Sequence, residues 1–209
     1  MNPLLEKFPE KIKIEDTECR INSDFKTALY CNALIENIPE GEDIPEDILL
    51  DMLKAFYPKT HLFKEEHLSK MFWFLSCGRE KEKRKFPRKA AGINNNKPFD
   101  FKEDADLIYA GFIQQYGIDL QKTDMHWWKF MILLENLGAE TRFSKVMEYR
   151  TRDISSKKLS KEERQFYAAM QKYFSLENRP RELDERSRKI EDALMRGEDI
   201  TELLRGDCD

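Results

Sequence analysis

The sequence predicts a mainly α-helical protein: a multi-helix bundle-like domain with a short N-terminal β-hairpin and a charged C-terminal helix. Of the 209 residues, 40% are hydrophobic and 36% are charged, with eight Gly and eight Pro, which is typical of helices with hydrated outer faces. Apolar residues recur at helical spacing along most of the chain. The alternation typical of strands is confined to the first two dozen residues.

The β signal lies between residues 11 and 21. Ile12 and Ile14 alternate with lysines, and Cys19 and Ile21 alternate again after a polar stretch. A period of two on both sides of a polar turn predicts a short hairpin.

Three amphipathic helices follow the hairpin within residues 1–78. Ser23 or Asp24 can cap the first helix, Pro45 suits the first turn of the second, and Gly78 ends the third. Because each helix has one apolar face, the three need a shared core.

Residues 79–99 are predicted to form a flexible basic loop, because they lack an apolar period and contain Pro, Gly and three consecutive Asn. Residues 79–89 carry seven Lys or Arg against two Glu. We interpret them as a solvated mobile loop, with an electrostatic docking site for an acidic protein and a nucleic-acid contact as alternatives. The whole chain has a net charge of −4, which argues against nucleic acid as a partner.

Residues 100–176 are predicted to form a central helical core. Asp100 and Glu103 resemble a capping box for its first helix, and Thr123 can cap the next. That second helix is apolar nearly all round over residues 127–134, so we expect it to be buried on all sides.

The last two helices of the prediction are more polar. Ser160 and Glu163 form a capping box for a helix with one apolar face. That face is formed by Phe166, Ala169, Met170 and Tyr173. Residues 177–209 are predicted to form a charged helical tail, whose thin apolar line can dock on a partner. That line contains Leu183, Ile190 and Leu194.

Trp127 and Trp128 are adjacent, so their side chains point about 100° apart on a helix. Either two neighbouring elements sandwich this helix, which we favour, or one indole is presented to a partner. The candidate partner-binding residues are therefore the two tryptophans and the apolar line of the tail, namely Trp127, Trp128, Leu183, Ile190 and Leu194.

The sequence predicts no enzyme and no cofactor or metal site. His61 and His67 are six residues apart, which does not fit a helical metal pair, and His126 is better explained by a structural hydrogen bond than as a base. Asp104 and Asp106 lie at a helix start, where the helix dipole explains them. The four cysteines read as free thiols. Since no membrane span or signal peptide is evident, we expect a soluble protein of the cytosol.

Three segments of the predicted core carry a recognisable combination of motifs: DFKEDADLIYAGFIQQYGIDL (100–120), MHWWKFMILLENL (125–137) and FSKVMEYR (143–150). INSDF (21–25), FYP (56–58) and FLSCG (74–78) fit the same combination. Taken together, these segments resemble a family of tail assembly chaperones from long-tailed phages (siphophages) and prophages of Gram-positive bacteria.

The resemblance implies a protein encoded between the tail-tube protein and the tape-measure protein. Such a protein coats the tape measure in the host cytoplasm, recruits tail-tube subunits and is absent from the mature virion. A structural tail or neck component that stays in the virion is the alternative, and self-association stays open. The family has no catalytic residues to transfer.

Overall fold

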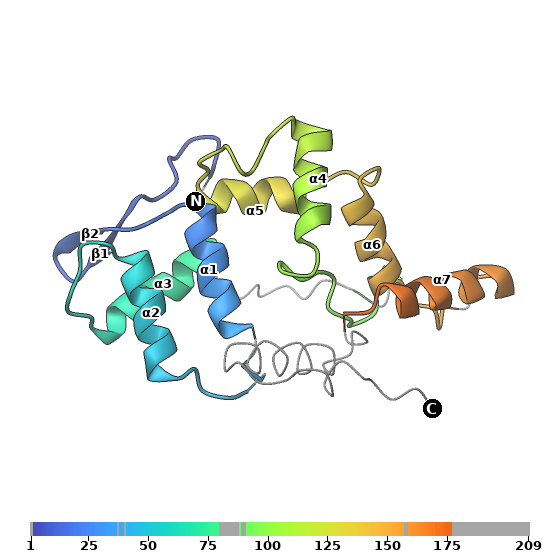
Figure 1. The fold of residues 1–209 in the computed structure, drawn as a ribbon, viewed down its shortest axis with the longest axis horizontal. Coiled ribbons are helices and arrows are strands. Elements are labelled where there is room, and N and C mark those ends of the chain that lie inside the picture. Colours follow the sequence, from blue (N-terminus) through green and yellow to red (C-terminus); the bar gives the residue numbers. More distant parts are fainter. Residues whose placement is uncertain are drawn as a thin grey trace, which may run out of the picture.

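The computed structural model describes residues 2–36, 38–39, 41–79, 88, 91–156 and 159–176. Within these residues it has seven α-helices and one two-stranded antiparallel sheet, which confirms the mainly α fold class. The elements are β1 (Lys11–Ile14), β2 (Thr17–Arg20), α1 (Phe25–Ile35), α2 (Glu46–Phe56), α3 (Glu65–Leu75), α4 (Ala105–Tyr116), α5 (Trp127–Glu135), α6 (Arg142–Thr151) and α7 (Lys161–Tyr173). In Figure 1 the hairpin and α1 to α3 lie at one end, α4, α6 and α7 lie at the other, and α5 lies between them.

The predicted hairpin is confirmed. Ile12 and Ile14 are buried while Lys11 and Lys13 are exposed, as the alternation requires. Glu15 in the turn ties the hairpin to α3: its carboxylate accepts from Lys64 Nζ at 2.7 Å, and its N–H donates to Glu66 at 3.1 Å. The hairpin is therefore fixed to the helical body.

The three N-terminal helices begin and end close to the predicted positions. Asp24 is the N-cap of α1, where its side chain accepts the N–H of Lys26 at 2.8 Å. The apolar faces of α1, α2 and α3 meet in one core, as predicted. Their buried members are Phe25, Ala28, Cys31, Met52, Leu53, Phe56, Met71 and Phe74.

Helix α5 lies at the centre of the fold, as predicted, but its N-cap is His126 rather than Thr123. The N–H groups of Phe25 and Trp127 bond to the carbonyls of Met125 and Ser23, so the backbone stays extended up to His126. The helix cannot begin earlier for this reason. Burial on all sides was only partly right, because residues 131–133 are half-buried.

Within the predicted flexible loop, the described stretch 91–99 is anchored to the end of α6. Asn94 Nδ2 donates to the carbonyls of Arg150 and Arg152, and Asn96 Nδ2 also donates to the carbonyl of Arg150. Ile93 forms an isolated β-bridge with Arg152. The three consecutive asparagines predict flexibility, but two of them donate hydrogen bonds to carbonyl groups at the C-terminal end of α6. Most of the basic run, residues 80–87 and 89, lies outside the described residues.

The assignment of Asp104 to a helix dipole was incomplete. Asp104 and Arg150 form a bidentate ion pair, with nitrogen–oxygen distances of 2.6 and 2.9 Å, and only 2% and 6% of these residues are exposed. Arg150 also donates to the carbonyls of Pro98 and Phe174. One side chain of α6 thus holds the start of α4, the segment before it and the end of α7.

The capping box predicted for Asp100 is half present. Asp100 accepts the N–H of Glu103 at 3.0 Å, but its own N–H donates to Asp104 rather than to the Glu103 side chain. Asp100 therefore closes a turn over residues 101–104, and α4 begins at Ala105.

Helix α7 keeps its predicted capping box but does not bury its predicted face. Ser160 and Glu163 exchange both capping hydrogen bonds. The helix packs on α6 through the neighbouring face, where Tyr167 contacts Tyr149 and Gln171 donates to the carbonyl of Arg152. As a result Phe166, Ala169 and Tyr173 are exposed.

Residues 177–209 lie outside the described residues, and with them Leu183, Ile190, Leu194 and Cys208. The cysteines within the described ranges, Cys19, Cys31 and Cys77, are free thiols as predicted. No helix of the described part is long and apolar enough to cross a membrane.

Candidate partner-binding groove

An apolar groove runs between α1 on one side and α4 with the preceding segment on the other. It consists of two adjoining hollows of about 510 and 480 Å³ that share Leu29 and Phe101. The first hollow extends past Ile35 and Phe99, and the second extends past Tyr109. All five of these side chains are half-buried, so apolar surface faces the opening.

Stacked aromatic rings build the floor of the groove. Phe130 of α5 stacks on Phe25 of α1 at 4.9 Å between ring centroids and on Phe112 of α4 at 5.1 Å. Because α1 and α4 both pack on this one ring, it holds them apart, and Leu29 and Tyr109 line the hollow between them.

Residues 97–104 form the second wall although they belong to no helix. Phe99 packs edge to face on Phe101 at 5.2 Å, and Phe101 contacts Trp127 at 5.9 Å. Arg150 fixes this segment at both ends, through the carbonyl of Pro98 and the carboxylate of Asp104. The wall is therefore rigid enough to keep its apolar rings exposed to the groove.

Charged groups of both signs lie around the mouth of the groove. Lys26 and Asp106 line one hollow, and Glu36, Lys97 and Lys102 line the other. An apolar floor with a charged rim is typical of a surface that receives the apolar stripe of an amphipathic helix.

Glu36 and Asp100 share a hydrogen bond across the mouth, which joins the end of α1 to the second wall. That hydrogen bond, together with partial burial, raises the pKa of Glu36 to about 7. Burial of Asp100 opposes its ionisation, but hydrogen bonds from Glu36, Lys97 and two backbone N–H groups hold its pKa well below the ordinary value. The pair therefore holds one proton, on Glu36, in mildly acidic solution.

We expect the stability of the protein to fall as Glu36 loses this proton. Its folded pKa of about 7 lies above its ordinary value of 4.5, so the stabilisation is complete below pH 4.5 and is lost as the pH rises through 7. Glu36→Gln donates the same hydrogen bond without titrating. Urea unfolding at pH 5.5 and 8 should show a smaller loss of stability for E36Q than for the natural protein. Equal losses in both proteins would contradict this account.

The two tryptophans are core residues, which confirms the favoured sandwich interpretation. Trp127 and Trp128 are 2% and 4% exposed. Their Nε1 groups donate to the carbonyls of Leu75 and Phe74 at 2.9 and 2.8 Å, so both indoles are satisfied at the end of α3. A role in partner binding would require exposed rings, and this fold uses them to join α3 to α5.

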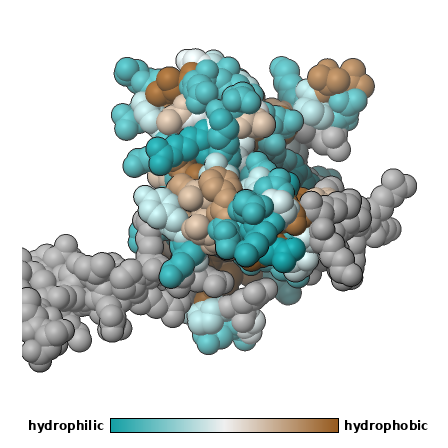
Figure 2. All heavy atoms as spheres, turned by 90° about the vertical axis from the view of Figure 1, so that its right-hand side faces the viewer, coloured by the Kyte–Doolittle hydropathy of each residue, from teal (hydrophilic) through white to brown (hydrophobic). Residues whose placement is uncertain are grey.

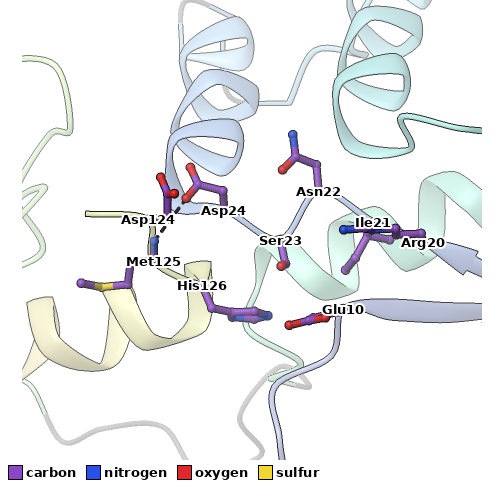
Figure 3. A pocket seen from close by; sticks show the side chains of 9 residues that line it. All are labelled: Glu10, Arg20, Ile21, Asn22, Ser23, Asp24, Asp124, Met125 and His126. Carbon is purple, nitrogen blue, oxygen red and sulfur yellow. Dashed lines mark hydrogen bonds between the residues drawn. The ribbon is translucent and has the colours of Figure 1, made fainter. Parts of the chain in front are cut away.

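A smaller polar hollow of about 310 Å³ surrounds the junction of α1 and α5, and Figure 3 shows Glu10 and the His126 ring facing each other there. His126 is already occupied, since Nδ1 accepts the N–H of Trp128 and Nε2 lies 3.0 Å from the carbonyl oxygen of Pro9. Burial lowers the pKa of His126. This is the structural hydrogen bonding that the sequence predicted for His126.

The other two histidines lie at or just before the start of α3. His67 Nδ1 accepts the N–H of Lys64 at 3.1 Å as part of the N-terminal cap of α3, and Tyr57 donates to the carbonyl of His67. His61 lies in the loop before α3. Across the described residues, no three His, Cys, Asp or Glu side chains gather as metal ligands would.

The groove and its second wall were not predicted from the sequence. Phe99 and Phe101 alternate with polar residues around Asp100, a pattern too short to separate a strand from an ordered loop. The useful signal was a pair of aromatic residues, Phe99 and Phe101, where the segment predicted to be flexible meets the predicted core.

The described residues form a mainly α-helical fold with an apolar groove between α1 and α4. Residues 4–176 match the family model for the bacteriophage Gp15 protein, and the chain belongs to that family. No curated protein and no solved structure matches the chain significantly.

Proposed function

We propose that this protein is a phage tail assembly chaperone that binds the tape-measure protein through the groove between α1 and α4. The groove carries the proposal, because it offers half-buried apolar side chains on two rigid walls. Membership of a bacteriophage family supports a role in making virus particles. The segments that resemble tail assembly chaperones support the narrower role.

In this proposal, the tape-measure protein is a long helical chain that exposes an apolar stripe. Such a stripe aggregates in water unless another surface covers it. Leu29 and Phe101 lie where the two hollows join, so an apolar residue of the bound helix at that point contacts both walls. The charged rim then faces the polar flanks of the bound helix.

A groove formed by a few half-buried side chains gives moderate affinity, which suits a chaperone that must leave. Many copies binding weakly along one tape measure keep it dispersed, and tail-tube subunits displace them one at a time. The proposal places this exchange in the host cytoplasm and leaves the chaperone out of the finished virion. It needs no catalytic residue, cofactor or metal.

Leu29→Asp should abolish the effect of the protein on a co-expressed tape-measure protein. It puts a charge at the junction of the two hollows, and the loss of one apolar anchor weakens binding by roughly 1.5–3 kcal/mol, or about 10-fold or more. The amount of soluble tape measure and its co-purification with the chaperone measure the result. Tyr30→Asp is the matched control, since it introduces the same charge one residue later, where the side chain is 49% exposed and does not line the groove.

Equal recovery of soluble tape measure with L29D and the natural protein would rule out the groove as the binding site, provided that circular dichroism shows both to be folded. Mass spectrometry of purified particles separates the chaperone from the alternative, a structural tail or neck component. A chaperone is missing from the virion, and a component is present in fixed copy number.

A further inference from the structure

The exposed face of α7 carries a stripe of four residues along one side of the helix. Glu162, Phe166, Ala169 and Tyr173 are spaced by four, three and four positions, which places them within a narrow arc. Phe166 is 49% exposed and Tyr173 is 77% exposed. Figure 2 looks onto the side from which α7 projects and shows brown and tan side chains that interrupt the teal surface.

Most of this stripe lies outside the face that holds α7 to the body of the protein. Most contacts with α6 and its C-cap Arg152 come from Tyr167, Gln171 and Phe174, which bond or stack with residues 148–152. Of the stripe, Phe166 also touches α6, where its ring packs edge to face on Tyr149 at 5.9 Å between centroids. The stripe lies beside that face, so a second helix can pack on it without displacing α6.

The spacing of the stripe residues, four, three and four positions, is the same from either end of the helix. When two copies of α7 lie antiparallel, with the symmetry axis between residues 167 and 168, Phe166 of each copy falls opposite Ala169 of the other. A large ring then fills the space above a small side chain, twice by symmetry. A parallel pair would instead set ring against ring and leave a gap between the two alanines.

The charges also fit the antiparallel arrangement. Glu162 falls opposite Tyr173 of the other copy, whose hydroxyl can donate to the carboxylate, and Lys172 lies next to that tyrosine. Each end of the pair thus brings Glu162 of one copy beside Lys172 of the other. A parallel pair would place Glu162 beside Glu162 and Lys172 beside Lys172.

We infer that α7 is a self-association surface, through which two copies of this chain pair in antiparallel orientation. The helix has 13 residues, so the contact is smaller than the roughly 800 Å² per partner of a stable interface. The dimer is therefore weak, with a dissociation constant on the order of 10–100 µM, and forms where copies are concentrated. The groove lies on other elements, so this inference does not depend on the proposed function.

Exchange of the charges tests the pairing directly. Sedimentation equilibrium of the natural full-length chain should show a monomer–dimer equilibrium. Glu162→Lys and Lys172→Glu should each raise the dissociation constant, roughly fivefold, because each places like charges together at both ends of the pair. The double variant E162K/K172E restores the attraction with the signs reversed and should recover the natural value within about twofold.

Ala169→Glu should abolish the dimer, because a charged side chain then meets Phe166 of the other copy. Glu162, Ala169 and Lys172 are exposed, so we expect all of these variants to fold. A thermal unfolding midpoint equal to that of the natural protein, measured at a concentration where the chain is monomeric, checks this. A chain that stays monomeric to millimolar concentration overturns the inference. The inference is also overturned if A169E still forms the dimer, or if the dissociation constant of E162K/K172E stays as high as that of the single variants.

Discussion

Arg150→Ala should lower the free energy of unfolding by about 3–5 kcal/mol, because it leaves the carboxylate of Asp104 buried without its charge partner. The loss extends beyond the ion pair. The carbonyls of Pro98 and Phe174 also lose their donor, so the second wall of the groove and the end of α7 are released together. Urea unfolding followed by circular dichroism measures the change.

Arg142→Ala is the control for that experiment. Arg142 lies on the same helix and is exposed, so its removal should change stability by less than about 0.5 kcal/mol. Combining Arg150→Met with Asp104→Leu removes both charges and should recover about half of the loss, since apolar pairs often replace buried ion pairs at little cost. An R150A protein as stable as R142A would show that the ion pair does not hold the fold.

Phe130→Ala should also cost about 3–5 kcal/mol, through lost burial and the cavity left behind. Phe130 is 1% exposed and stacks on Phe25, Phe112 and Trp127. It is the ring that separates α1 from α4, so its loss should also let the groove collapse. Leu29 would then become less accessible, and a cysteine introduced at position 29 should be labelled more slowly in F130A than in the protein with Phe130.

Phe166→Ala removes the same side chain from an exposed position on α7. Its ring is 49% exposed, and the change should cost less than about 1 kcal/mol at protein concentrations where the chain is monomeric. Equal destabilisation by F130A and F166A would contradict the central position assigned to α5.

The helices could be predicted from the sequence because their apolar periods and caps are local. Asp24 and Ser160 cap the helices that they precede. The start of α5 could not be predicted, because backbone bonds to a segment a hundred residues earlier keep the chain extended up to His126. Periodicity also does not show whether a face is covered. It predicts the apolar face of α7 but not that Phe166, Ala169 and Tyr173 of that face are exposed.

The groove could not be predicted for a related reason. Its second wall is a segment without regular structure, and Arg150 holds that segment from 46 to 52 positions away in the sequence. An Asp at a helix start and an Arg in a polar helix each have an ordinary local explanation. Only their contact in the fold shows that they act together.

Hydrogen exchange of the purified protein, alone and with a synthetic tape-measure helix, tests the groove most directly. The account predicts slower exchange over residues 25–36 and 97–109, which form the two walls, with little change in α3. The L29D protein should show neither effect. Protection confined to other segments, or none in the presence of a helix that binds, would contradict the assignment of the groove as the binding site.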